Sequence, residues 1–211
     1  MNRITLPLGD YGANCYVLTD DATRQACVID PGVLSEALVR ALDGYELKYI
    51  LLTHGHFDHI LGVNGLRELF PAVQVAIHQE DEICLTDPAY NLAGDAELPE
   101  HVCRMKADLL LTDGMKLPFA DTEFEVLHTP GHSRGSVCFV DRRNRAIYSG
   151  DTLFCLTVGR TDFIGGDFEQ LLESLHRFLP FEDDTDVFPG HNRATTIGFE
   201  KKRNRYLRKM S

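Results

Sequence analysis

Short apolar runs separated by turn-forming residues dominate the first half of the chain. Residues 14–18 and 26–29 are apolar runs of strand length joined by a polar turn, which is typical of a hairpin. Further on, apolar residues recur every three or four positions, which is the spacing of one helix face. These patterns predict strands over 14–18, 26–29, 49–52 and 73–77 and helices over 33–42 and 60–70, with residues 81–106 irregular.

The second half of the chain repeats the order of strands followed by helices. Strands that come first in hairpins and then alternate with helices favour sheets covered by helices, an α/β architecture. Since no Pro-, Gly- or Ser-rich linker divides the chain, we expect a single domain over residues 1–211. The predicted elements are strands over 124–127, 136–140, 146–148 and 186–188 and helices over 168–178 and 200–209.

The charge balance of the chain is strongly acidic. Lys and Arg number 21 and Asp and Glu number 32, which gives a formal net charge of −11. Because nucleic-acid backbones and anionic membrane surfaces repel such a chain, we expect neither as a partner. No apolar run approaches the ~20 residues that span a bilayer, and the first residues lack the apolar stretch of a signal peptide. We therefore expect a cytoplasmic protein, in which the six cysteines are free thiols.

Four metal-competent side chains fall within six residues, directly after the predicted strand 49–52. They are His54, His56, Asp58 and His59. Imidazole and carboxylate are the ligands that zinc and similar divalent ions prefer. Residues two apart in an extended segment point to the same side, so His54 and His56 can share one ion. Asp58 and His59 are adjacent and point away from each other, which leaves this second pair for another ion.

Three later residues stand in the same context of an apolar strand, a small or rigid turn and then a ligand type. His132 and His191 each follow a Pro-Gly turn, and Asp151 follows a Ser-Gly pair. Ligands at the ends of rigid strands are held well and gather at one edge of a sheet. The sequence therefore predicts a metal site built from seven residues.

In this order the motifs resemble those of the metallo-β-lactamase superfamily, and the resemblance covers nearly the whole chain. It implies a four-layer αββα sandwich with two divalent metal ions at one edge, zinc in the first place, although the ligand set also accepts iron or manganese. It implies that His54, His56 and His132 bind the first ion and Asp58, His59 and His191 the second, with Asp151 bridging both. Asp58 and Asp151 would then be the catalytic carboxylates, holding the ions around a bridging hydroxide that attacks a carbonyl carbon.

Two further stretches, residues 159–163 and 195–201, look like the glyoxalase II (hydroxyacylglutathione hydrolase) branch, in particular its short bacterial members. That resemblance implies a small-molecule thioester substrate such as S-lactoylglutathione. The chain departs from the branch at Asn192-Arg193, where Gly-Pro is usual, and over residues 154–158, where smaller residues are usual. A thiol other than glutathione therefore remains an alternative as the carrier of the acyl group. Candidate substrate-binding residues are Arg160, Arg193 and Lys201, although an ion pair with Asp162 is the alternative role of Arg160.

Other functions remain open on the same residues. A lactonase or phosphodiesterase would share the metal chemistry, and a persulfide dioxygenase would need one iron held by two His and one Asp. A binding protein that has lost catalysis is a third alternative, which the full set of seven ligand types disfavours. Four histidines match no ligand position and are expected to be structural, with His128 a possible support for His132: His78, His101, His128 and His176.

Overall fold

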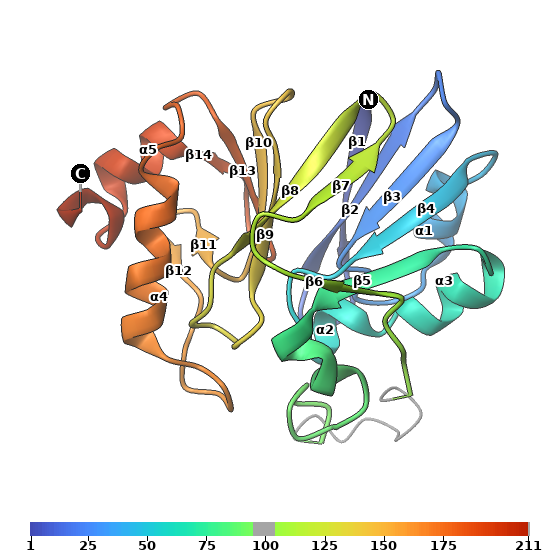
Figure 1. Ribbon diagram of the computed structural model, residues 1–211, viewed down its shortest axis with the longest axis horizontal. Helices are drawn as coiled ribbons and strands as arrows, with labels where there is room; N and C mark the ends of the chain where they lie inside the picture. The colour runs from blue at the N-terminus through green and yellow to red at the C-terminus, as the bar shows by residue number, and fades with distance from the viewer. Residues whose placement is uncertain (95–103, 211) are drawn as a thin grey trace.

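Two six-stranded sheets lie face to face in the computed structural model, which describes residues 1–94 and 104–210 (Figure 1). The first sheet has the order β1-β2-β3-β4-β5-β6. Its first two pairings are antiparallel, whereas β3, β4, β5 and β6 run parallel to one another. The strands are β1 (Asn2–Leu8), β2 (Ala13–Asp20), β3 (Gln25–Ile29), β4 (Glu46–Leu51), β5 (Gln74–His78) and β6 (Leu109–Leu111).

The second sheet has the order β14-β13-β10-β9-β8-β7, and only its pair β10 and β13 is parallel. A small hairpin of β11 (Leu153–Phe154) and β12 (Thr157–Val158) stands apart from it. The strands of the second sheet are β7 (Lys116–Phe119), β8 (Thr122–His128), β9 (Val137–Asp141), β10 (Ala146–Gly150), β13 (Asp186–Pro189) and β14 (Thr195–Thr196).

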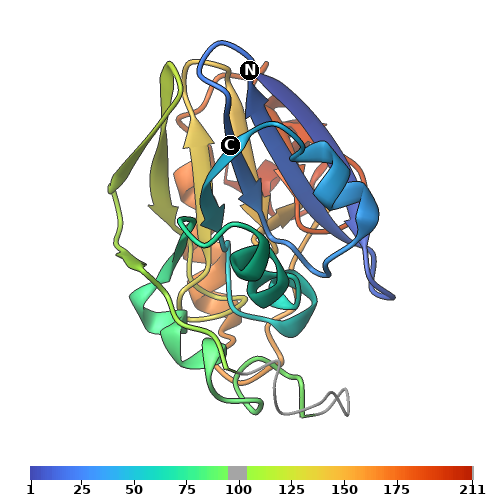
Figure 2. The ribbon, with the colours of Figure 1, turned by 90° about the vertical axis from the view of Figure 1, so that its right-hand side faces the viewer.

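Helices cover the outer face of each sheet. One group lies on the first sheet, seen face-on in Figure 2, and the other lies on the second sheet at the opposite side of the molecule (Figure 1). The first group is α1 (Glu36–Ala41), α2 (Phe57–Ile60) and α3 (Val63–Leu69), and the second is α4 (Phe168–Leu175) and α5 (Ile197–Arg203). The short 3₁₀ turns are η1 (Gln79–Leu85), η3 (His176–Phe178) and η4 (Leu207–Lys209). The expected four-layer αββα sandwich is confirmed.

Three apolar layers hold the four layers together, because both faces of each sheet are buried. Alternate side chains of β2 show how one strand serves two layers. Cys15 and Val17 pack under the helices of the first sheet, whereas Tyr16 and Leu18 pack between the two sheets. A third cluster lies between the second sheet and α4 and α5. Among the described residues, no helix is long and apolar enough to cross a membrane.

The helix predicted over 60–70 is wrong in its continuity. The chain forms α2, then breaks at Leu61 and Gly62, then forms α3. At the break the Gly62 N–H donates to Pro31 O at 2.7 Å, and a Cβ at Gly62 would also lie 2.7 Å from that oxygen. This close approach requires glycine and redirects the chain.

The helix predicted over 200–209 is also wrong in its bounds, because α5 starts at Ile197 and ends before Asn204. The prediction of strands missed β1, β6 and β7 and the two-residue strands β11, β12 and β14. The irregular stretch 81–106 contains part of η1, and residues 95–103 lie outside the described chain.

Strand direction brings the candidate ligands to one edge. In parallel strands the carboxyl ends meet at the same edge of the sheet, and loops there can converge on one site. The segment after β4, which includes α2, carries His54 to His59, the loop after β10 carries Asp151, and the loop after β13 carries His191. His132 lies in the connection between β8 and β9.

Candidate metal centre

The segment after β4 changes from extended chain to helix within the motif. His56 is the residue before α2 and has extended backbone angles, whereas Asp58 and His59 lie in the first turn of the helix. The turn brings Asp58 Oδ2 and His59 Nε2 to 3.6 Å of each other, so the two side chains converge rather than diverge as expected. Gly55 permits close packing, because a Cβ there would lie 2.2 Å from Cys84 Cβ.

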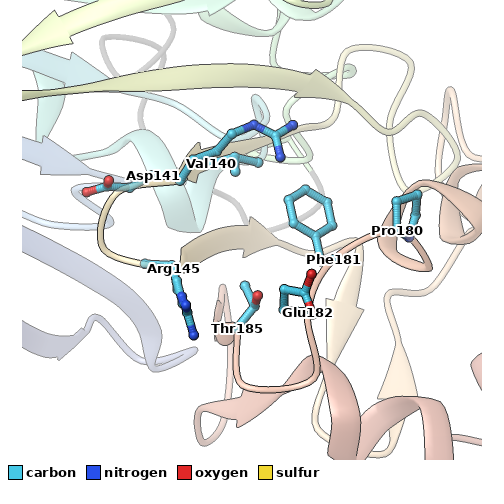
Figure 3. Close-up of a pocket in the computed structure, with 9 residues that line it drawn as sticks. Val140, Asp141, Arg145, Pro180, Phe181, Glu182 and Thr185 are labelled. Atoms are coloured by element: carbon cyan, nitrogen blue, oxygen red, sulfur yellow. The ribbon is translucent and has the colours of Figure 1, made fainter.

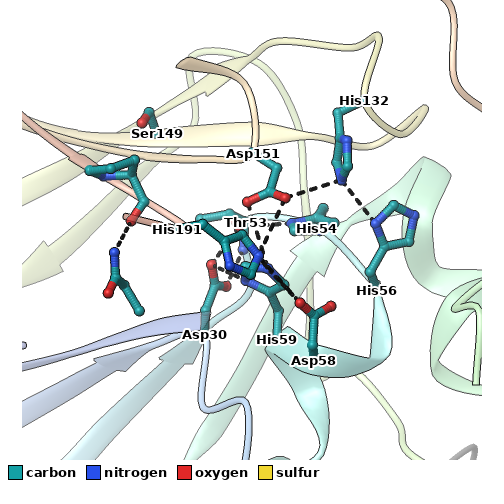
Figure 4. A network of polar contacts seen from close by, with 12 residues as sticks. Asp30, Thr53, His54, His56, Asp58, His59, His132, Ser149, Asp151 and His191 are labelled. Carbon is teal, nitrogen blue, oxygen red and sulfur yellow. Dashed lines mark hydrogen bonds and ion pairs between the residues drawn. The ribbon is translucent and has the colours of Figure 1, made fainter. Parts of the chain in front are cut away.

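The structure brings six of the seven predicted ligands into two neighbouring trios, with the seventh, Asp151, beside both (Figure 4). In each trio the ligand atoms all lie within 4.8 Å of one another. In the first trio, His132 Nε2 lies 2.9 Å from His56 Nδ1. In the second, His59 Nε2 lies 3.2 Å from His191 Nε2. The trios are His54, His56 and His132, and Asp58, His59 and His191.

Asp151 reaches both trios with its two carboxylate oxygens. Its Oδ2 lies 3.5 Å from His132 Nε2 and 3.7 Å from His191 Nε2, and its Oδ1 lies 3.6 Å from His59 Nε2. Gly190 makes room for this carboxylate, since a Cβ at Gly190 would lie 2.1 Å from Asp151 Oδ1. The Pro-Gly-His motif therefore supplies both a candidate ligand, His191, and the space beside it.

Hydrogen bonds on the far side of the rings fix which nitrogen faces the centre. His132 Nδ1 lies 2.7 Å from Arg160 O, and His59 Nδ1 lies 3.1 Å from Asp30 Oδ2. Because a carbonyl or carboxylate oxygen only accepts, Nδ1 carries the proton in both rings, and the Nε2 lone pair is left for the centre. Histidines that bind metal are usually held in this way.

His54 is oriented by a relay through Thr53. The Thr53 hydroxyl donates to Asp30 Oδ2 at 2.6 Å, so its oxygen accepts from His54 Nδ1 at 3.1 Å. His54 Nε2, His56 Nε2 and Asp151 Oδ1 are buried without a hydrogen-bond partner among the described residues. Buried polar atoms without a partner are costly, and His54 Nε2 and Asp151 Oδ1 gather with other donor atoms of the kind that zinc and iron prefer. His56 faces His132 with Nδ1 rather than with its unpartnered Nε2. The residues present therefore fit one or two divalent cations.

Comparison with protein families decides the relationship. A model of the metallo-beta-lactamase superfamily matches residues 8–191, which includes all seven candidate ligands. The chain belongs to the metallo-beta-lactamase superfamily. Three similar proteins, described next, indicate which branches of the superfamily the chain resembles, but they do not identify its substrate.

Hydroxyacylglutathione hydrolase GloC of Haemophilus influenzae is 34% identical over 100% of both chains. The crystal structure of BLEG-1 B3 metallo-beta-lactamase matches with a TM-score of 0.88 and 39% identity, over 98% of this chain and 99% of that one. TTHA1623, crystallised in a di-iron-bound form, matches with a TM-score of 0.84 and 35% identity, over 97% of this chain and 100% of that one. The glyoxalase II-like resemblance expected from the sequence is thereby confirmed.

The electrostatics of the two trios differ in this metallo-beta-lactamase superfamily protein. Burial, then the neighbouring imidazoles, lower the pKa of His54 and of His56 well below the usual value, so both rings are neutral and able to bind metal. Burial alone would lower the pKa of His59, but Asp58 and Asp151 outweigh it and raise that pKa to about 10, so without a cation this ring binds a second proton, which metal binding at Nε2 would displace. The second trio therefore attracts positive charge.

A cleft of about 570 Å³ opens over the centre. It exposes His56, Asp58, His132, Asp151 and His191 at its floor. Its walls come from segments far apart in sequence and are largely aromatic or aliphatic. The wall residues include Tyr11, Phe57, Leu92, Phe154, Val158 and Phe163. From the sequence, Phe154 and Val158 were noted only within the stretch 154–158 that departs from the glyoxalase II branch, and no local motif marks the other four as lining a cleft.

Of the three candidate substrate-binding residues, only Arg160 lines the described cleft. It is engaged with Asp162, as in the alternative role that the sequence suggested. Arg193 Nε lies 3.3 Å from Cys155 Sγ, at the exposed surface. Lys201 Nζ donates to Phe181 O at 2.8 Å and pairs with Asp183, so the structure does not bring it to the cleft.

Three polar residues that support the centre were missed from the sequence. Asp30 holds His59 and Thr53, as described above. The Asn14 side-chain amide donates to Pro189 O at 3.0 Å and to Asn192 O at 2.8 Å, on either side of His191. Asp81 accepts from Gly55 N, Gly135 N and Ser133 Oγ and thus ties together the two loops that carry the first trio.

The remaining histidines lie outside both trios. The rings of His78 and His128 stack with centroids 4.0 Å apart and link the ends of β5 and β8. Together with Glu80 they form a further group whose ligand atoms lie within 4.8 Å of one another, but His78 Nδ1 accepts from Glu80 N at 3.3 Å. His128 Nε2 donates to Arg134 O, in the loop that carries His132. His176 is half exposed beside Glu173, and His101 lies outside the described residues.

A smaller depression of about 200 Å³ lies where β10 and β13 begin, at the ends of these strands opposite the metal centre (Figure 3). Its arginines are engaged elsewhere, since Arg145 pairs with Asp184 and Arg142 pairs with Glu125. It brings together none of the candidate ligands.

Proposed function

We propose that the protein is a dinuclear metal-dependent hydrolase of thioesters, of the kind represented by S-lactoylglutathione. The observation that carries the dinuclear site is the position of Asp151, whose carboxylate reaches His132 of one trio and His59 and His191 of the other. The thioester is supported by the similarity to a hydroxyacylglutathione hydrolase over the full length of both chains. The proposed ions are zinc, with iron as the alternative because TTHA1623 was crystallised in a di-iron-bound form.

When bound, such ions supply Lewis acidity and a nucleophilic water at neutral pH. The chain supplies the rest. Asp151 holds the two trios at a fixed separation, and Asp30 and the Arg160 carbonyl keep the histidine rings oriented. Asp58, at 3.3 Å from His191 Nε2, adds the second negative charge that balances the cations.

The balanced reaction favours a thioester over an amide at this site. Water adds to the carbonyl carbon, the C–O bond forms, the C–S bond breaks, and the sulfur leaves with the electron pair of that bond. A thiol has a pKa of about 8.5, so it leaves as a thiolate without a strong proton donor. An amine would need one. The protons of the consumed water end on the thiol and on the solvent.

The test is hydrolysis of S-lactoylglutathione by purified protein of measured metal content, followed by release of free thiol. His56→Ala should lower the rate by at least 100-fold, whereas His176→Ala, at an exposed position outside the trios, should leave it unchanged. A second measurement, the metal bound per chain, should fall only in His56→Ala. Full metal occupancy without release of thiol would exclude this substrate.

A β-lactam is the second candidate substrate, and one specific observation favours it. The protein matched at 39% identity over nearly the whole of both chains is a B3 metallo-beta-lactamase. The same metal-loaded protein should therefore be assayed with a β-lactam and with a simple lactone. Turnover of either with a kcat/KM above that of every thioester would replace the proposal.

A further inference from the structure

The walls above the metal centre place aromatic rings against both trios. The Phe163 ring centroid lies 5.5 Å from that of His56 and 6.4 Å from that of His132. The Phe154 ring lies 6.1 Å from His191, nearly perpendicular to it. A substrate carbonyl held at the floor would therefore have an aromatic ring on each side.

The outer part of the cleft is aromatic as well. Tyr11 is 61% exposed, and its ring packs edge-on against Phe57 with centroids 5.1 Å apart. Phe57 in turn packs with Leu92 and Phe163 in a small apolar cluster. A substrate can cover an exposed aromatic ring beside the floor of the cleft, because removing apolar surface from water is favourable in free energy.

Positive charge in the walls is already neutralised. Arg160 is the one Lys or Arg among the described residues that line the cleft. Its Nε and Nη2 donate to the two carboxylate oxygens of Asp162 at 2.7 and 2.6 Å. Its guanidinium carbon lies 4.0 Å above the Phe163 ring. This bidentate ion pair occupies the two donor positions of Arg160 that a substrate carboxylate would otherwise use.

The wall beside the second trio is held in place by a buried carboxylate. The hairpin of β11 and β12 carries Phe154, and its turn is fixed from α5. Glu200 accepts from Leu156 N at 2.9 Å, and the Asn204 amide donates to Thr157 O at 3.0 Å. Glu200 is fully buried. These buried hydrogen bonds therefore fix the position of the hairpin that carries the apolar wall.

We propose that the cleft selects thioesters whose groups next to the carbonyl are apolar and uncharged, over thioesters of a charged thiol such as glutathione. This inference rests on the proposed thioesterase function. The aromatic walls bury the acyl chain, while no free cation of the described cleft compensates the carboxylates of a charged carrier. Each methylene that the walls cover should raise kcat/KM by about fourfold.

The experiment compares acetyl, butyryl and hexanoyl thioesters of the neutral thiol N-acetylcysteamine with S-lactoylglutathione, on the metal-loaded protein. We expect kcat/KM to rise along the acyl series and to exceed that of S-lactoylglutathione by at least tenfold for the longest chain. Phe154→Ala and, separately, Phe163→Leu should flatten the series. Phe168→Ala, an exposed aromatic on α4 that packs against Tyr206, should keep the slope.

A charge variant tests the second half of the inference. Asp162→Asn frees Arg160, so kcat/KM for S-lactoylglutathione should rise severalfold, with the neutral thioesters within twofold of the wild-type values. A flat acyl series, with S-lactoylglutathione the best substrate, would overturn the inference and leave thioester hydrolysis intact. Failure of the fully metal-loaded protein to hydrolyse any thioester would instead overturn the proposed function.

Discussion

The imidazole rings of the metal centre are positioned by hydrogen bonds on their outer side. His132 is held by the Arg160 carbonyl, and His59 and His54 are held directly or through Thr53 by Asp30. A ring with its Nδ1 proton committed in this way has one rotamer and one tautomer suited to the centre. At the scale of single residues, the site is thus as much a set of outer hydrogen bonds as a set of ligands.

Asp81 supports the same centre through the loops that carry the ligands rather than through an imidazole ring. Its buried carboxylate accepts from Gly55 N at 3.1 Å, Gly135 N at 2.6 Å and Ser133 Oγ at 2.7 Å. Asp81→Ala leaves two buried N–H groups and a hydroxyl without this acceptor, at about 1–3 kcal/mol each. We expect the free energy of unfolding to fall by about 3–5 kcal/mol, and the metal affinity of the first trio to fall with it. Denaturant unfolding and metal titration measure the two effects.

Asp121→Ala is the matched control, since it removes an exposed carboxylate paired with Arg143. Its effect on stability should stay below about 1 kcal/mol. If Asp81→Ala bound two metal ions as tightly as the wild type, Asp81 would have no part in positioning the first trio.

The difference between predicted and missed site residues follows from sequence distance. His54 to His59 were predictable because their spacing along a short segment itself limits where the side chains point. Asp81 contacts Gly55 from 26 positions away and Ser133 from 52 positions away. A buried aspartate has no sequence signature that distinguishes it from a surface one. Only the packing of η1 between the two ligand loops makes it a support.

At the scale of elements, α5 controls the shape of the cleft through the β11–β12 hairpin. Glu200 accepts from Leu156 N, Thr195 Oγ1 and Asn204 Nδ2, all within 2.9 Å. Glu200→Ala removes three hydrogen bonds from a buried site, so we expect a loss of about 3 kcal/mol in stability and a raised KM. Glu200→Gln keeps an oxygen for the first and third of these donors, and its amide can donate to the Thr195 hydroxyl.

Steady-state kinetics and thermal unfolding of both variants test the role of the hairpin. Glu200→Gln should restore KM to within about threefold of the wild-type value, because the shape of the acceptor site is kept. A KM that is unchanged in Glu200→Ala would show that the cleft wall does not depend on this contact.

The stacked pair of His78 and His128 joins the two sheets at the ends of β5 and β8, and it makes stability depend on pH. Burial, and then His128, lower the pKa of His78 to about 4 in the folded protein. The unfolded chain, with a histidine pKa near 6.5, binds the proton more tightly. Stability should therefore fall as the pH drops from about 6.5 to about 4, by roughly 1–3 kcal/mol from this residue.

His78→Asn isolates that contribution. His78 caps η1 by accepting from Glu80 N at 3.3 Å, and asparagine can keep this bond while it cannot titrate. We expect the variant to lose less stability than the wild type between pH 6.5 and 4, measured by denaturant unfolding at fixed metal content. Parallel pH curves for the two proteins would contradict the assignment.

The elements that sequence patterns found and missed differ in burial. Strands β2 and β3 are buried nearly throughout and stand out as apolar runs. By contrast, β1 is an edge strand, exposed over most of its length and containing Pro7. It is recognised only through its pairing with β2, which local pattern does not reveal. The break between α2 and α3 likewise arises from contact with Pro31 rather than from helix propensity.

At the scale of the whole molecule, the metal centre joins the two sheets at one edge. The loop after β4 of the first sheet supplies four of the candidate ligands, and loops of the second sheet supply the other three. Asn14 and Tyr16 of β2 also reach across, since both donate to Pro189 O at the end of β13. The apolar layer between the sheets and the proposed ions at their edge would therefore act on the same interface.

Removal of the metal should weaken this edge and leave the centre of the sandwich intact. A ligand whose free concentration is 1,000 times its Kd stabilises the folded state by about 4 kcal/mol. A chelator that removes the metal should therefore lower the unfolding temperature markedly. Hydrogen exchange should speed up together around His54–His59, His132, Asp151 and His191, because the same ions hold all four segments. Exchange within β9, buried throughout, should stay unchanged. His56→Ala should show a smaller response to the chelator, and His176→Ala the full response. Faster exchange in the loops of one sheet alone would mean that the ions do not connect the two sheets.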